Sequence, residues 1–108
     1  MLEITELDFF ITRFILKDML SDFMNYLMNT KLSTVSAKKY ESGVRAISKL
    51  MLQEGVIIKP LENMNSIEFN SVYISIKQNE SFIRKDTVGK NMYKRALDYY
   101  KEYLTTKE

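Results

Sequence analysis

Cationic and small polar side chains gather in two stretches of this 108-residue chain. In the first stretch, such a residue recurs at steps of four, three and four: Lys38, Ser42, Arg45 and Lys49. This spacing places the four side chains along one side of an α-helix. Cations neutralise phosphates, and small hydroxyl groups fix the register of a protein on a nucleic-acid backbone. The stripe therefore indicates phosphate binding, although a solvated helix face carries the same residue types.

The second stretch surrounds the predicted start of the last helix, where cations alternate with a hydroxyl, an amide and Tyr93. We expect the cations of both stretches at phosphates, and the hydroxyl and amide groups near groove edges. The candidate DNA-contacting residues are Ser36, Lys38, Lys39, Ser42, Arg45, Lys49, Arg84, Lys85, Thr87, Lys90, Asn91, Lys94 and Arg95.

Charge is segregated along the chain, although the formal net charge is only +2. Residues 1–30 carry two basic and five acidic groups (net −3), and residues 60–83 carry one and three (net −2). Residues 31–59 carry six basic and two acidic groups (net +4), and residues 84–108 carry seven and four (net +3). If folding brings the two cationic segments side by side, the protein has one positive face.

The composition argues against catalysis and against a bound metal or cofactor. The chain has no histidine and no cysteine, so it lacks the usual zinc ligands, the usual acid–base group at neutral pH and thiol chemistry. Its glycines Gly43, Gly55 and Gly89 are scattered singly, so they form no phosphate-binding loop. We therefore expect no enzymatic activity, no cofactor and no small-molecule substrate.

Length and hydropathy favour one compact cytoplasmic domain. A chain of 108 residues with 45% hydrophobic content is large enough to bury a core without disulfides. No uninterrupted apolar run approaches the roughly 18 to 20 residues that cross a bilayer. The chain opens with acidic residues where a secretory signal is basic. We expect a soluble protein with no membrane partner.

The element predicted at the centre is a helix over Ser33–Glu54. Its apolar residues recur at helical spacing on the side opposite the cations: Ala37, Tyr40, Val44, Ile47 and Met51. Ser33 or Thr34 is suited to cap its start, and Gly55 to end it in the left-handed conformation.

The remaining segments predict an all-α bundle of four to five helices over residues 1–108. Residues 1–16 form an amphipathic extension that covers the core or contacts a second chain, and the apolar face changes register near Leu16. Val56–Ile58 is expected to be a connector whose isoleucines enter the core. Asn65 and Glu68 resemble a capping box that opens a helix, with a strand as the rival interpretation.

Two further expectations concern the C-terminal part of the chain. Phe82 and Ile83 are predicted to anchor a loop. The final helix is predicted over Thr87–Thr105, with a core-facing stripe of Met92, Ala96, Tyr99, Tyr100 and Tyr103, and with Leu104 near its end.

Two quoted stretches carry a family resemblance. FMNYLMNTKLSTVSAKKYESGVRAISKLMLQEG and DTVGKNMYKRALDYYKEYL, joined by a Pro-containing connector and a short helix, resemble the N-terminal core-binding (SAM-like) domain of tyrosine recombinases and phage integrases. The closing pattern is also similar to that of N-terminal helical domains of some restriction endonucleases: Tyr93, Ala96, Leu97, Tyr100, Tyr103 and Leu104. The resemblance covers residues 18–105, and residues 1–16 are extra to it.

The resemblance implies a module that clamps double-stranded DNA. In the family, the second and fourth helices lie against the major groove and its flanking phosphates, and they correspond here to Ser33–Glu54 and Thr87–Thr105. The recombinase catalytic domain, with its arginines, histidine and nucleophilic tyrosine, has no counterpart in this chain. The hypothesis is thus a DNA-binding module of a recombinase-like or restriction system, or a mobile-element regulator. The rival is a protein-interaction or dimerisation module that docks through residues 1–16 or through the tyrosine-rich last helix.

Overall fold

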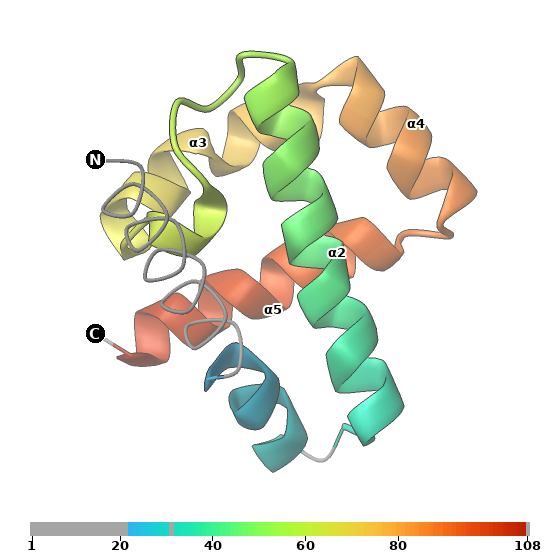
Figure 1. Cartoon of the computed structure of the whole chain (residues 1–108), viewed down its shortest axis with the longest axis vertical. Coiled ribbons are helices and arrows are strands. Elements are labelled where there is room, and N and C mark those ends of the chain that lie inside the picture. The colour runs from blue at the N-terminus through green and yellow to red at the C-terminus, as the bar shows by residue number, and fades with distance from the viewer. Residues whose placement is uncertain (1–21, 31, 108) are drawn as a thin grey trace, which may run out of the picture.

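All regular structure in residues 22–30 and 32–107, which this computed structural model describes, is helical. Residues 22–29 form a helical segment, which is followed by α2 (Thr34–Gln53), the 3-10 turn η1 (Leu61–Asn63), α3 (Ser66–Gln78), α4 (Glu80–Val88) and α5 (Met92–Lys107). The predicted compact all-α bundle is confirmed (Figure 1). The predictions for residues 1–16, and for the register change near Leu16, lie outside the described residues. None of the described helices is both long and apolar enough to cross a membrane.

Helix α2 has the boundaries that the sequence predicts. The Ser33 hydroxyl oxygen accepts a hydrogen bond from the Ser36 N–H at 3.1 Å, which satisfies one of the unpaired donors at the helix start. At the other end Gly55 has φ +74°, and the Val56 N–H donates to the Met51 carbonyl at 3.0 Å. This pattern closes the helix because glycine adopts the left-handed conformation without a steric penalty.

The main helix–helix contact is the crossing of α2 over α5 (Figure 1). A Cβ atom at Gly43 would lie 3.1 Å from the Met92 sulfur and 3.2 Å from the Ala96 Cβ. The two backbones therefore approach closely at this point because Gly43 and Ala96 are small. Helices from the two cationic segments, residues 31–59 and 84–108, therefore pack together.

The core is built around the tyrosines of α5. Tyr100 is fully buried and contacts Phe23 edge-on at 5.0 Å between ring centroids and Phe69 at 5.4 Å. Tyr103 is also buried and contacts Phe23 at 5.5 Å. Such offset and perpendicular ring contacts stabilise aromatic pairs beyond their buried area. The predicted core-facing stripe of α5 is confirmed, with Met92 and Tyr99 half-buried at its edge.

The segment after α2 is partly as predicted. Asn65 and Glu68 form the predicted capping box, with the Glu68 N–H bound to the Asn65 side chain at 2.9 Å and the Asn65 N–H bound to the Glu68 carboxylate at 3.2 Å. α3 is therefore a helix, not the rival strand. Ile57 is buried in the core, but Ile58 is 97% exposed, so the prediction that both isoleucines enter the core is wrong for Ile58.

The loop predicted around Phe82 and Ile83 is wrong, because these residues belong to α4. The Asn79 side chain accepts from the Phe82 N–H at 3.0 Å and caps α4, while the Asn79 N–H donates to the Ile76 carbonyl at the end of α3. One residue thus ends one helix and starts the next, so no polar loop separates them. Phe82 is buried as expected of an anchor, and Ile83 is exposed.

The final helix starts at Met92 and not at Thr87. Thr87 lies in the last turn of α4, and the chain then turns through Gly89, Lys90 and Asn91. Lys90 and Asn91 have φ values of 55° and 68°, which no right-handed helix accommodates. The pattern of apolar spacing did not reveal this break because Val88 and Met92 keep helical spacing across it.

Candidate nucleic-acid interface

The α2 stripe, defined as Lys38, Ser42, Arg45 and Lys49, lies on the exposed side of α2. The opposite side of the helix is buried and includes Ala37, Val44, Ser48 and Met51. The neighbouring Lys39 is also exposed. The structure therefore places these side chains where the helical spacing predicts them, on the exposed side of the helix.

Among the described residues, Arg45 is the one member of the α2 stripe that forms a salt bridge. Arg45 forms a salt bridge with Glu41 one turn earlier, at 3.0 Å between Nη2 and Oε1. Within the described residues, Lys38, Lys39 and Lys49 form no salt bridge. Ser36 differs from the others because it is half-buried and its hydroxyl accepts from Ser33 at 3.1 Å, so it belongs to the cap of the helix.

The second group of candidates, which we name the α4–α5 cluster, spreads over three local structures. Its members lie in α4, in the turn and in the first turn of α5: Arg84, Lys85, Thr87, Lys90, Asn91, Lys94 and Arg95. All are exposed except Lys85, which is half-buried. The Thr87 hydroxyl donates to the Ile83 carbonyl at 2.8 Å. In the part of the chain that is described, no cation of this cluster forms a salt bridge.

Asp86 fixes the turn that carries Lys90 and Asn91. Its side chain is buried, and Oδ1 accepts from the Lys94 N–H in the first turn of α5 at 2.9 Å. Its carbonyl accepts from the Asn91 N–H, also at 2.9 Å. A left-handed non-glycine residue costs roughly 1–2 kcal/mol, and the two bonds of Asp86 offset part of that cost. Sequence reasoning missed this role, because Asp86 lies six residues before α5, beyond the usual capping position.

The crossing of α2 and α5 brings parts of the two groups close together. Ser42 adjoins Gly43 in α2, and Lys94 and Arg95 lie between Met92 and Ala96, the two residues that Gly43 contacts. The α2 stripe lies on the side of α2 turned away from its buried face, so the two groups flank the crossing from different helices. That they form one continuous positive surface stays a prediction.

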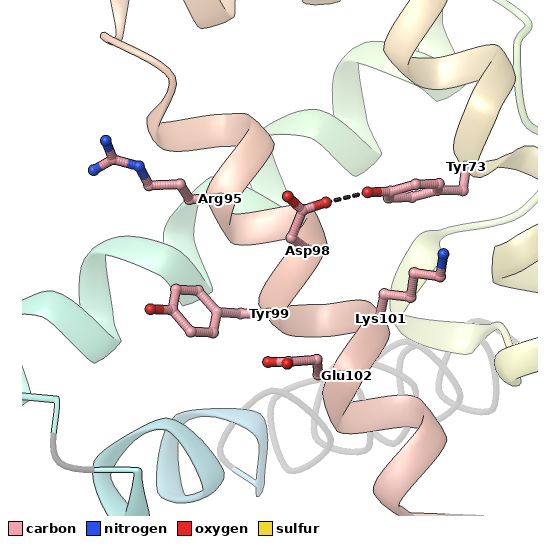
Figure 2. A pocket seen from close by; sticks show the side chains of 6 residues that line it. All are labelled: Tyr73, Arg95, Asp98, Tyr99, Lys101 and Glu102. Carbon is pink, nitrogen blue, oxygen red and sulfur yellow. Dashed lines mark hydrogen bonds between the residues drawn. The ribbon is translucent and has the colours of Figure 1, made fainter.

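A second polar region, which we name the Tyr73–Asp98 hollow, lies between α3 and α5. It has a volume of about 450 Å³ and is lined by Tyr73, Arg95, Asp98, Tyr99, Lys101 and Glu102. Figure 2 shows Asp98 and Lys101 on the side of α5 that faces Tyr73, while Arg95, Tyr99 and Glu102 project away from it. Arg95 is therefore the one predicted site residue that lines this hollow.

Tyr73 is the centre of a bonded network in this hollow. Its hydroxyl donates to the Asp98 carboxylate, and Lys77 Nζ donates to the same hydroxyl at 3.2 Å. Lys101 Nζ lies 4.5 Å from the ring centroid. Partial burial, followed by the hydrogen bond to Asp98, raises the pKa of Tyr73 to about 12. Helical spacing does not reveal this bond, because its partner lies 25 positions away in the sequence.

Glu62 of η1 is a buried acid, as Asp86 is. Its Oε1 has no hydrogen-bond partner among the described residues. Burial raises the pKa of the Glu62 carboxyl, and the Ser48 hydroxyl and the Arg45 charge oppose that rise. No three His, Cys, Asp or Glu side chains within residues 22–30 and 32–107 are placed to hold a metal ion.

Comparison of this chain with known proteins gives no match. Neither a protein-family model, nor a curated protein, nor a solved structure matches this chain. The resemblance to core-binding domains therefore remains a hypothesis that depends on the residues quoted for it.

Proposed function

We propose that this protein is a helical DNA-binding module that acts in the cytoplasm as part of a recombinase-like or restriction system, or as a mobile-element regulator. The observation that supports the proposal is the set of exposed cations on α2, on α4, in the turn and at the start of α5 that form almost no salt bridges among the described residues. The α2 stripe with Lys39, and the α4–α5 cluster, contain nine cations, of which only Arg45 has a salt bridge among the described residues.

Unpaired cations on rigid helices suit a polyanion. A surface lysine with a carboxylate neighbour is already partly neutralised, whereas an unpaired one releases counterions from DNA when it contacts a phosphate. The elements that carry these cations are fixed by the Gly43–Ala96 contact and by the Asp86 bonds to the turn. Binding is therefore dominated by phosphates, with the exposed Ser42 and Asn91 available near base edges.

The test is the salt dependence of binding to a fluorescent 20-base-pair duplex, measured by anisotropy. Wild-type affinity is expected to fall steeply with salt, because each phosphate contact adds about 0.9 to the slope of log affinity against log salt. Lys49→Ala in α2 and Lys94→Ala in α5 are each expected to reduce this slope by about one. The Asp86 bond survives in Lys94→Ala because it uses the backbone N–H.

Lys77→Ala and Lys101→Ala are the matched controls. Both remove a lysine, but these lysines lie over the ring of Tyr73, at 4.7 Å and 4.5 Å from its centroid. They are expected to leave the slope unchanged. Undetectable binding of the wild type at about 50 mM salt, or binding independent of salt, rules out the proposal.

A protein-interaction module is the second candidate, and the outer face of α3 favours it. Ile67 and Ile74 are 77% and 64% exposed and lie two turns apart. The exposed residues between them on that face, Asn70 and Ser71, are uncharged. The tyrosine-rich last helix does not favour docking, because Tyr100 and Tyr103 belong to the core. Sedimentation at several concentrations separates this candidate from DNA binding, since self-association through α3 makes the mass depend on concentration.

A further inference from the structure

A second hollow lies beside the α4–α5 turn, and we name it the Tyr93 hollow. It has a volume of about 340 Å³ and is lined by Arg84, Lys85, Val88, Gly89 and Tyr93. The volume falls within the roughly 300–1,000 Å³ that small-ligand sites occupy. The hollow is contributed by the second half of α4, the turn and the first turn of α5.

The ring of Tyr93 forms one wall of the hollow. Lys85 Nζ lies 5.0 Å from the ring centroid, so an ammonium group lies over the ring, which is half-buried and also packs against the core. Val88, which lines the hollow beside it, is 85% exposed. The hollow thus presents an aromatic ring and an aliphatic side chain to solvent, which together suit a flat ligand.

Gly89 keeps the edge of the ring free of side chains. A Cβ atom there would lie 2.9 Å from Tyr93 Cε2, closer than atoms in contact approach. Gly89 has φ −82°, a value that any residue adopts, so the backbone conformation does not require glycine. The close approach of the Tyr93 ring requires it.

The charge of the hollow is positive. Arg84 and Lys85 line it, and no carboxylate among the described residues does. The Tyr73–Asp98 hollow, by contrast, includes Asp98 and Glu102. Two cations beside a half-buried ring repel a cationic ligand and attract one that combines a flat apolar ring with negative charge. A nucleotide has this combination, since its base stacks on aromatic rings and its phosphate binds cations.

We propose that the Tyr93 hollow binds one unpaired nucleotide of DNA. The base stacks on Tyr93, Lys85 moves from the ring to the phosphate of that nucleotide, and Arg84 contacts the adjacent phosphate. A paired base is covered by its neighbours and cannot enter, so the preferred substrate is a duplex with a bulged, flipped or single-stranded nucleotide. This inference depends on the proposed function, and it adds the class of DNA that the module selects.

The experiment compares two DNA probes of the same sequence. One is a 20-base-pair duplex, and the other carries a single bulged 2-aminopurine, whose fluorescence falls when it stacks on an aromatic ring. The wild type is expected to bind the bulged probe about tenfold more tightly and to quench its fluorescence, in line with the affinity contributed by one stacked base. Tyr93→Phe keeps the ring and is expected to retain both effects. Tyr93→Leu is expected to lose both, and to bind the two probes equally.

A second variant tests the hollow without touching its ring. Val88→Glu places a carboxylate at an exposed position, so it preserves the fold and is expected to abolish the preference for the bulged probe. Ile74→Glu makes the same charge change at an exposed position of α3 and is expected to keep the preference. Thermal unfolding monitored by circular dichroism checks that each variant is folded.

The outcomes separate this inference from the proposed function. Failure of the wild type to bind either probe at low salt refutes the proposed function. Binding of both probes with equal affinity, or a preference that survives in Tyr93→Leu and in Val88→Glu, refutes the nucleotide site and leaves duplex binding intact.

Discussion

The Tyr73–Asp98 hollow and the Tyr93 hollow contain the same main parts, a half-buried tyrosine with a lysine ammonium over its ring. They differ in charge balance. In the first, the Tyr73 hydroxyl is bound to Asp98, and Glu102 lies nearby. In the second, no carboxylate among the described residues lines the hollow. In the Tyr73–Asp98 hollow, the bond between opposite side chains links α3 to α5. In the Tyr93 hollow, the positive charge of the lining is not balanced by a carboxylate and is available to a negatively charged ligand.

Two sides of α5 are also held in different ways. One side is held by close approach, where Gly43 of α2 lies against Met92 and Ala96. The other side is held by a bond between side chains, from Tyr73 of α3 to Asp98. Close packing stabilises a helix while consuming no charged group. Among the described residues, Lys94 and Arg95 form no salt bridge, and both are exposed next to this close contact.

The largest expected effect comes from breaking the close approach at Gly43. Gly43→Leu places a side chain where even a Cβ lies within 3.2 Å of Ala96, so α2 and α5 must separate. We expect a loss of about 3 kcal/mol in the free energy of unfolding, measured by urea denaturation, since overpacking a core costs roughly 1–3 kcal/mol or more. Ser42→Leu, on the exposed side of the same turn, is the control and is expected to change stability by less than about 0.5 kcal/mol. Equal stability of the two variants would show that the crossing does not hold α5.

Much of α2, and the caps of α2 and α3, were predictable from local sequence. The spacing of apolar residues and cations predicts which side of α2 is buried, because both follow the 3.6-residue repeat of one helix. The Ser33 cap, the Gly55 end and the capping box of Asn65 and Glu68 were also predictable. Each of these depends on residues within one or two turns of each other.

The features that the sequence did not reveal depend on a helix junction without a loop, or on bonds between residues far apart in the sequence. α4 was missed because Asn79 ends α3 and caps α4 without an intervening loop. The Asp86 bond to Lys94 spans eight residues, and the Tyr73 bond to Asp98 spans 25. Such partners are set by how the helices pack, and helical periodicity carries no information about that.

Removing the charge of Asp98 tests how the Tyr73–Asp98 hollow links α3 to α5. Asp98→Asn keeps the shape of the side chain but weakens the acceptor of the Tyr73 hydroxyl, and it removes one of the two carboxylates that line the hollow with Lys101. We expect unfolding to become easier by about 1 kcal/mol, a value reduced from that of a buried charged bond because the site is partly exposed. DNA affinity is expected to rise a few-fold, because the hollow then resembles the unpaired one.

The pH dependence of that loss follows from the pKa of Tyr73. Burial first, and then the bond to Asp98, raise its pKa from the ordinary 10.0 to about 12, so the neutral phenol contributes fully to stability below pH 10 and this contribution is lost as the pH rises through about 12. The difference between wild type and Asp98→Asn should therefore disappear in strong alkali. Absorbance titration of tyrosinate, with Tyr73→Phe to identify the signal, checks the pKa. A Tyr73 that titrates at the same pH in Asp98→Asn and in wild type contradicts the assignment.

The smallest expected effect concerns Glu62 of η1, whose Oε1 has no hydrogen-bond partner among the described residues. Because burial raises its pKa above 4.5, the protonated carboxyl is favoured in the fold, and wild type loses stability as the pH rises through the folded pKa. Glu62→Gln removes the charge, so it is expected to match wild type below pH 4.5 and to exceed it by about 0.5 kcal/mol at pH 7. The gain is limited because the amide still buries a polar atom.

Glu68 is the control, because its pKa is shifted in the opposite direction to that of Glu62. Its hydrogen bond to Lys59, aided by the Asn65 N–H, lowers its pKa below 4.5, so its contribution is present above that pH and is lost as the pH falls through the folded value. Glu68→Gln should therefore be less stable than wild type at pH 7 and equal to it in acid, where Glu62→Gln also equals wild type. If Glu62→Gln is instead destabilised at pH 7, the attraction of Arg45 outweighs the burial of the carboxylate. In that case Arg45 interacts with the Glu62 carboxylate as well as with Glu41. We then expect Arg45 to be the one cation of the α2 stripe that does not contribute to DNA affinity.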